Sequence, residues 1–180
     1  MIEEIELIRE VKTGNRQVFG ELVSRHQQRV YNLAWRMLGE NRDAEDATQE
    51  TFLRAFRAFR AFDDERPLTP WLMKIAVNVC LNMLQVQKEG EPYDEERTSS
   101  RGHVGRVVEG AVQADERRKR IEREILRLAP RYRAVIELRH FQEMSYQEMA
   151  SALQRPLSDI KSDLFRARRL LADRLKGLEG

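Results

Sequence analysis

The sequence has little of several features that mark common classes of protein. Its 180 residues include a single cysteine, Cys80, so no disulfide can form within the chain. No apolar run approaches the ~20 residues of a membrane span. The N-terminus is amphipathic and partly acidic, unlike a signal peptide. We therefore expect a cytoplasmic protein, and we find neither internal repeats nor low-complexity tracts.

Motifs that carry catalysis or bind metals are also missing. The soft ligands are Cys80, His26, His103 and His140, which are scattered along the chain without zinc spacing. The sequence contains no P-loop and no serine, histidine and aspartate arrangement of a hydrolase. We therefore expect no enzymatic activity, no catalytic residue, no metal, no cofactor and no small-molecule substrate.

Net charge is low, but the charges are unevenly distributed. Lys and Arg number 32 and Asp and Glu number 30, a balance of +2, so nucleic-acid binding cannot be inferred from net charge. Between Lys161 and Lys176 six basic residues accompany two acidic ones, a local charge of +4. Between Glu40 and Glu50 five acidic residues accompany one arginine, a local charge of −4. This separation favours two surfaces with different partners.

Hydrophobic periodicity predicts an all-α protein of two small modules. Residues 1–88 form the first, and its amphipathic helices are expected over residues 2–12, 19–38, 43–59 and 71–87. Gly39 is expected to end the second helix and Asp43 to cap the third. Residues 89–114 are rich in Glu, Gly, Ser and Arg, which predicts a flexible linker. Residues 115–180 form the second module, and each module is near the lower size limit for its own core.

The helix expected over residues 43–59 has a buried side and an acidic side. Small residues and aromatic residues fall at helical spacing on the buried side: Ala44, Ala47, Thr51 and Ala55, then Phe52, Phe56 and Phe59. Asp46, Gln49, Glu50 and Arg54 point outward. From the residues alone, a solvated surface is the favoured interpretation of this outer face, and a protein-docking surface is the alternative.

The helix expected over residues 71–87 also has two faces. Its buried side is predicted to consist of Trp71, Ile75, Val79 and Met83. Lys74, Asn78 and Asn82 form one polar stripe. Amide and ammonium groups in line can hydrogen-bond bases and phosphates, although a plain polar face has the same pattern.

The strongest local pattern lies between residues 128 and 169. Ser145 and Glu148 form a capping box at the start of one helix, and Pro156 separates it from the next. The second helix has one apolar stripe: Leu157, Ile160, Leu164, Ala167 and Leu171. Its outer face is polar and basic: Ser158, Lys161, Ser162, Phe165, Arg166 and Arg169. This pattern is typical of a helix-turn-helix whose second helix enters a major groove, although a basic helix that caps an ordinary bundle would share it.

Several runs of residues resemble bacterial RNA polymerase sigma factors. Four blocks match region 4 in order: Leu128-x-Pro130-x-Tyr132-Arg133, Leu138-Arg139-His140-Phe141, Ser145-Tyr146-x-Glu148-x-Ala150 and Lys161-Ser162-x-Leu164-x-Arg166-Ala167-Arg168. Two blocks resemble region 2: Asp43-Ala44-Glu45-Asp46-x-x-Gln49-Glu50-x-Phe52 and Trp71-Leu72-x-Lys74-Ile75-Ala76-Val77-Asn78. The lack of regions 1 and 3 indicates the extracytoplasmic-function group (group 4), of the sigma-E type.

The resemblance implies a function and a role for each surface. A sigma factor directs RNA polymerase to promoters, helps to melt the DNA and starts transcription, here for a stress or envelope regulon. Its partners are core polymerase, through the β′ clamp helices and the β flap, promoter DNA and an anti-sigma factor, which is often membrane-bound. The implied polymerase-binding residues are Asp43, Asp46, Gln49, Glu50 and Phe52.

The resemblance also assigns the DNA contacts. The −10 element would be contacted by Trp71, Lys74, Asn78 and Asn82, and the loop over residues 62–70 would hold a flipped-out base. The −35 element would be read by Ser158, Lys161, Ser162, Phe165 and Arg166, with Arg168 and Arg169 on phosphates. A free-standing regulator with a helix-turn-helix is the alternative, but it leaves the block from Asp43 to Phe52 unexplained.

Three features depart from the family pattern. Ser158 and Asp159 stand where relatives usually have small residues or Thr, and Asp163 stands where they usually have a basic residue. Acids on or beside the reading helix would repel phosphates, although Asp159 could instead favour the helix N-terminus. The run Asp63-Asp64-Glu65-Arg66-Pro67 replaces a more basic segment that contains glycine. We therefore expect modest affinity for the −35 element, and the resemblance determines neither the −35 sequence nor the base captured in the loop.

Overall fold

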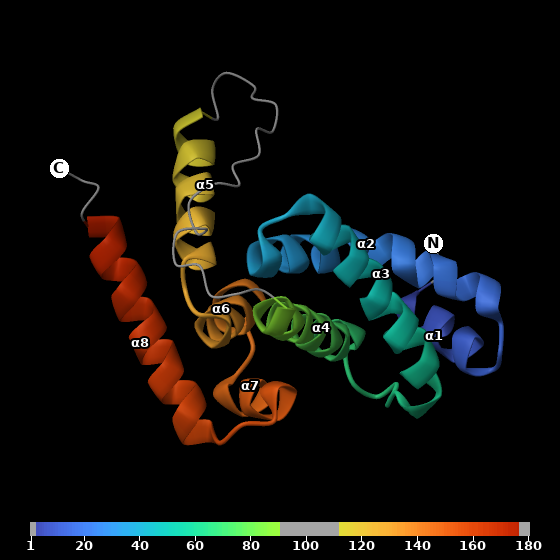
Figure 1. Ribbon diagram of the computed structural model, residues 1–180. Coiled ribbons are helices and arrows are strands. Elements are labelled where there is room, and N and C mark those ends of the chain that lie inside the picture. Colours follow the sequence, from blue (N-terminus) through green and yellow to red (C-terminus); the bar gives the residue numbers. More distant parts are fainter. Residues whose placement is uncertain (1–2, 91–111, 177–180) are drawn as a thin grey trace.

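The computed structural model describes residues 3–90 and 112–176, which are helices joined by short connections, without a strand in these two ranges. Figure 1 shows helices α1 to α4 on one side of the molecule and α5 to α8 on the other. The predicted all-α fold is confirmed. Of the predicted linker, residues 89–90 and 112–114 are helical, and the remainder, with His103, lies outside the described residues.

The first module is a bundle built on three long helices. α1 (Glu4–Lys12) packs on α2 (Arg16–Leu38), and α2 packs on both α3 (Asn41–Ala58) and α4 (Leu68–Gly90). A short 3₁₀ helix, η1 (Phe59–Ala61), follows α3. The predicted stripe of small residues is buried in the bundle, as are Phe52 and Phe59. Phe56 differs from the prediction, because it is 37% exposed and its ring meets Phe19 edge-on at the rim of the core.

Three sequence-based details of the first module are wrong. Glu40, not Asp43, is the N-cap of α3, and its carboxylate accepts from the Asp43 backbone N–H. α4 begins at Leu68, three residues before Trp71, because Pro70 suits the first turn of a helix. Of the predicted buried side only Val79 is buried, whereas Trp71, Ile75 and Met83 are half-buried. The buried residues are more numerous than one face could supply: Leu68, Leu72, Met73, Ala76, Val77, Val79 and Cys80. α4 has neighbours on two sides, α2 and α3 on one and α6 and α7 on the other.

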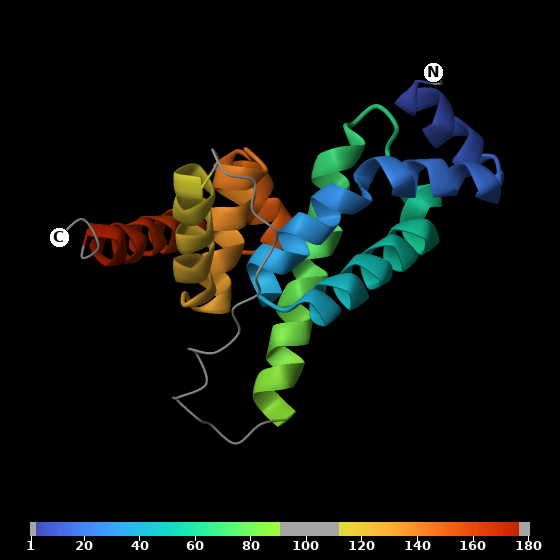
Figure 2. The same cartoon turned by 90° about the horizontal axis from the view of Figure 1, so that it is seen from above.

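The second module contains a helix-turn-helix. α5 (Val112–Leu126) leads to α6 (Pro130–Ile136), which continues as a π-helical stretch, η3 (Glu137–Phe141). α7 (Tyr146–Leu153) and α8 (Leu157–Lys176) follow, and both α6 and α7 pack on α8. Figure 2, seen from above, shows α5, α6 and α8 gathered beside the bundle.

The two modules share one apolar core. Leu33, Met37 and Met73 of the first module belong to the same buried cluster as Leu138 and Leu164 of the second. α6 contacts both α2 and α4, and α7 contacts α4. The described modules are therefore packed against each other rather than held apart.

Gly39 is placed where the modules meet, and we expect Gly39→Ala to be more costly than Gly14→Ala. Both glycines have positive φ (+74° and +104°), which costs other residues about 1–2 kcal/mol. A Cβ on Gly39 would also lie 2.9 Å from Leu126 Cδ1, whereas one on Gly14 would meet nothing within 4 Å. Urea unfolding should show an excess loss of about 1 kcal/mol for Gly39→Ala. A Leu126→Ala background should remove that excess, and an equal loss at both glycines would contradict the contact.

Candidate nucleic-acid and protein interfaces

Local hydrogen bonds fix the start of α7, the first helix of the helix-turn-helix. The Ser145 hydroxyl accepts from the Glu148 N–H at 3.1 Å, and the Glu148 carboxylate accepts from the Ser145 N–H at 2.7 Å, so the predicted capping box is present. Gln154 ends α7 in the left-handed conformation, with φ of 52°. Two residues later Pro156 precedes α8, as the sequence predicts.

α8 separates its apolar and polar residues onto opposite sides. Ile160, Leu164 and Ala167 are buried against the rest of the module. The residues of α8 predicted to contact the −35 element are all exposed: Ser158, Lys161, Ser162, Phe165, Arg166, Arg168 and Arg169. Phe165 is 67% exposed, which is uncommon for a phenylalanine that has no external partner to contact. The outer face of α8 therefore offers four cations, two hydroxyls and an aromatic ring to solvent.

Contacts with η3 and α6 orient two of these arginines. Arg168 Nε donates to His140 Nε2 at 3.1 Å. Burial lowers the pKa of His140, and the nearby Arg168 and Arg139 lower it further, so the ring is neutral and able to accept at pH 7. Arg166 approaches the hydroxyl of Tyr132 in α6. A hydrogen bond from the neighbouring Arg131 lowers the pKa of that hydroxyl.

Asp163 does not belong to this face, which corrects the expectation that it would repel phosphates. Its side chain is buried, 4% exposed, and it lies between Ile160 and Leu164 on the apolar side of α8. Arg155 Nη2 lies 2.7 Å from Asp163 Oδ2, so the acid pairs with the turn of the helix-turn-helix. Asp159 is exposed in the first turn of α8, where an acid favours the helix N-terminus.

The residues predicted to contact polymerase lie along α3. Asp46 and Gln49 are exposed, and Glu50 pairs with Arg54 on the same face, with 2.6 Å between Oε1 and Nε. Asp43 accepts a hydrogen bond from Gln87 of α4. Phe52 is 9% exposed and belongs to the core, so it supports the helix from beneath.

The same face contains an apolar residue that the sequence analysis did not select. Leu53 is 51% exposed and follows Gln49 by four residues, which places it on the same side of the helix. Its spacing from Gln49 could have identified it. An exposed apolar side chain among polar ones is a common arrangement in protein interfaces.

The residues predicted to contact the −10 element share one side of α4. Trp71 packs against Phe62 and Phe59, with ring centroids 4.8 and 5.9 Å apart. Lys74 is half-buried and Asn82 is exposed. Asn78 Nδ2 donates to the Ala152 carbonyl of α7 at 3.0 Å, so this amide lies in the contact between the modules.

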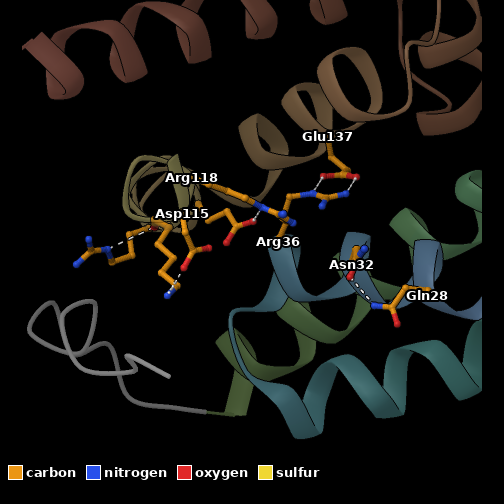
Figure 3. Close-up of polar contacts among 9 residues, drawn as sticks. Gln28, Asn32, Arg36, Asp115, Arg118 and Glu137 are labelled. Atoms are coloured by element: carbon orange, nitrogen blue, oxygen red, sulfur yellow. Dashed lines mark hydrogen bonds and ion pairs between the residues drawn. The ribbon is translucent and has the colours of Figure 1, made fainter. Parts of the chain in front are cut away.

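A buried ion pair joins the modules. Arg36 of α2 and Glu137 of η3 form two parallel hydrogen bonds of 2.6 and 2.8 Å, and Figure 3 shows the two side chains facing each other. Arg36 is 8% exposed and Glu137 is 2% exposed. The Arg36 guanidinium also stacks on the Phe141 ring, 4.0 Å from its centroid. Gln142 donates to Glu137 and accepts from Arg29, which extends the network to the surface.

Arg133 makes a second connection of the same kind. It donates to the carbonyls of Leu128, Leu126 and, across the contact, Met37, at 2.9, 2.6 and 2.7 Å. Burial lowers the pKa of Arg133 to about 10, so the guanidinium stays protonated at neutral pH. Its charge lies at the C-terminal end of α2, where helix carbonyls favour a cation.

The described residues contain neither a metal-binding group of three or more His, Cys, Asp or Glu side chains nor a helix that could cross a membrane. Burial raises the pKa of the Cys80 thiol to about 12, so the thiolate is not available as a nucleophile at neutral pH. Cys80 is therefore a small residue of the core.

The fold and these surfaces define a two-module helical protein with a helix-turn-helix in its second module. Family models for "Sigma-70 region 2" and "Sigma-70, region 4" match residues 22–89 and 118–171. The ECF RNA polymerase sigma factor SigW of Bacillus subtilis (strain 168) is 32% identical over 95% of this chain and 96% of its own length. The ECF RNA polymerase sigma-E factor of Escherichia coli (strain K12) is 30% identical over 96% of this chain and 94% of its own.

The chain belongs to the sigma-70 family of RNA polymerase sigma factors, in the extracytoplasmic-function group. Members are DNA-binding factors for transcription initiation, and this chain is accordingly such a factor.

Two solved structures share the fold. CnrH in complex with the cytosolic domain of CnrY has a TM-score of 0.68 at 24% identity and covers 97% of this chain and 98% of its own. The sigma factor RpoE in complex with the anti-sigma factor NepR, from Bartonella quintana, has a TM-score of 0.67 at 19% identity and covers 88% and 96%.

Proposed function

We propose that the outer face of α8 reads the −35 element as duplex DNA. The observation that carries this proposal is the exposed set of Lys161, Phe165 and Arg166 on a helix whose other side is buried. An α-helix fits the major groove, where Lys and Arg recognise guanine and an apolar group contacts the thymine methyl. Arg168 and Arg169 lie farther along α8, where they would contact phosphates.

In the first module we propose two further surfaces. Asp46, Gln49, Glu50 and Leu53 on α3 would bind the β′ clamp helices of core polymerase, with Asp43 and Phe52 holding that helix in place. Trp71, Lys74, Asn78 and Asn82 on α4 would contact the separated −10 strand, on which aromatic stacking and cationic contacts are the usual means of binding.

Promoter binding requires the modules to separate in this scheme. Asn78 is occupied by the Ala152 carbonyl, so it can meet DNA only after α7 moves away. Sites one to two helical turns apart are ~34–68 Å from each other. Twenty-one residues join Gly90 to Val112, and a chain of that length can reach about 70 Å at full extension, enough to connect the two sites.

We also propose control by an anti-sigma factor. Between the modules lies an open groove of about 330 Å³ whose lining is apolar, except for Arg131 and Arg155. A partner helix with apolar and acidic residues would fit this groove and hold the modules closed. The protein would then act in the cytoplasm, without enzymatic activity, and an anti-sigma factor in the membrane would hold it there until a stress or envelope signal released it.

Reconstituted transcription tests the proposal. The purified chain and core polymerase should produce a run-off transcript from a template that carries the upstream sequence of the chain's own gene. Gel shifts should show weak DNA binding by the chain alone and strong, salt-sensitive binding with core polymerase. Tight, specific binding without polymerase would instead favour a free-standing regulator, and the absence of any transcript would reject the proposed function.

A further inference from the structure

Residues 63–67 form an acidic segment between η1 and α4 whose two ends are fixed by α1. Phe62 and Leu68 flank the segment, and each is only 3% exposed. They belong to a second apolar cluster, separate from the main core, which contains Leu7, Ile8, Val11, Leu22 and Phe59. Three members of this cluster come from α1, so the packing of α1 determines where the segment begins and ends.

Lys12, the last residue of α1, also holds the middle of this segment. Its Nζ donates to the Phe62 carbonyl at 2.9 Å and to Asp64 Oδ1 at 2.8 Å. The Lys12 hydrogen bond is the largest cause of the lowered pKa of Asp64, so this carboxylate is charged at neutral pH. Asp63 tightens the same turn, because its carboxylate accepts from the Glu65 N–H at 3.1 Å.

The segment leads directly into the first turn of α4, which contains Trp71. The Trp71 ring contacts Phe62 directly, so a shift of the segment relative to α1 would also move it relative to Trp71. The matching family model begins at residue 22, and α1 lies wholly before it. Lys12 thus connects a helix outside the matched region to a surface proposed to bind the −10 strand.

We infer that Lys12 is a positioning residue for promoter reading. By holding Asp64 and the Phe62 carbonyl, it sets where residues 63–67 stand beside Trp71, and so influences which base of the −10 strand the chain accepts. Lys12 itself does not touch DNA. This inference rests on the proposed −10 contact and adds α1 to the parts that determine specificity.

Base preference, measured for each position of the −10 element, tests the inference. Initiation by holoenzyme that contains Lys12→Met is measured on a set of templates in which each −10 position carries each of the four bases in turn. We expect the preference at one position to weaken by about fivefold or more, the lower end of what one wrong base pair costs. Preferences in the −35 element and the melting temperature should stay unchanged. Asp64→Ala, which removes the acceptor, should weaken the same preference, and adding it to Lys12→Met should change little more.

Two further variants separate position from charge. Arg9, exposed one turn earlier on α1, also lowers the pKa of Asp64 through its charge but has no described hydrogen bond to the segment, so Arg9→Met should leave every preference intact. Lys12→Arg can still donate to both acceptors and should restore most of the preference. A uniform loss of initiation across all templates, or a fall in melting temperature alone, would make Lys12 an ordinary structural contact and overturn the inference. If the unaltered chain starts no transcript, the proposed function fails and this inference fails with it.

Discussion

Replacing Arg166 with alanine should lower initiation from a −35-dependent promoter by about 5- to 150-fold, which corresponds to ~1–3 kcal/mol for one specific base contact. Arg166 is exposed on the outer face of α8, while Leu164 and Ala167 beside it are buried. The substitution should therefore change the free energy of unfolding by less than about 0.5 kcal/mol. Run-off transcription by reconstituted holoenzyme and urea unfolding measure the two quantities.

Arg118→Ala is the matched control for Arg166→Ala. It removes the same charge from an exposed position on α5, where Arg118 is paired only with Glu122 of its own helix among the ion pairs described, and initiation should stay near normal. If Arg166 contacts a phosphate, its loss should also reduce the salt dependence of promoter binding by about one unit of slope. If it reads a base, preference at one −35 position should relax instead. Equal losses for the two variants would mean that total charge matters and the face of α8 does not.

The helix-turn-helix could be predicted from sequence because every determinant is local. Ser145 and Glu148 are three residues apart, and Pro156 marks the break before α8. The apolar residues of α8 recur at the helical period. Each of these interactions forms within one or two turns of the chain, so no knowledge of distant partners is needed.

Two features of the surfaces were misjudged although the sequence contained the relevant pattern. Asp163 follows Ile160 by three residues and precedes Ala167 by four, which places it on the buried side of α8. The run from Trp71 to Cys80 is apolar nearly all round, which is typical of a helix with neighbours on both sides. Assigning α4 one buried face missed the second neighbour, because that neighbour comes from the other module.

The contact between the modules could not be derived from periodicity. Glu137 stands alone in an apolar run, and a buried carboxylate requires a partner. Its partner Arg36 is 101 residues away, in a helix with several other basic side chains. The sequence thus indicates that a cation is needed but does not select Arg36.

Removing one member of this pair is expected to be costly, whereas removing both is not. Glu137→Leu or Arg36→Met alone should lower the free energy of unfolding by about 3–5 kcal/mol, because each leaves a buried charge without its partner. The double variant replaces the pair with apolar side chains in an apolar core, an exchange that is often neutral or stabilising. Urea unfolding of the two single variants and the double variant therefore measures the coupling between the modules.

In each single variant, the remaining charge on Glu137 or Arg36 can become solvated if the two modules separate. Spin labels at Gln17 and Asp173, both exposed and in different modules, report that separation in a Cys80→Ala background. Each single variant should lengthen and broaden the distance distribution, and the double variant should return it toward that of the unaltered chain. Lys119→Met breaks a 2.7 Å ion pair with Asp115 inside α5. It should leave the distance between the labels unchanged and alter the free energy of unfolding by less than about 0.5 kcal/mol. Single variants that keep both the original distance and the original stability would show that Arg36 and Glu137 do not hold the modules together.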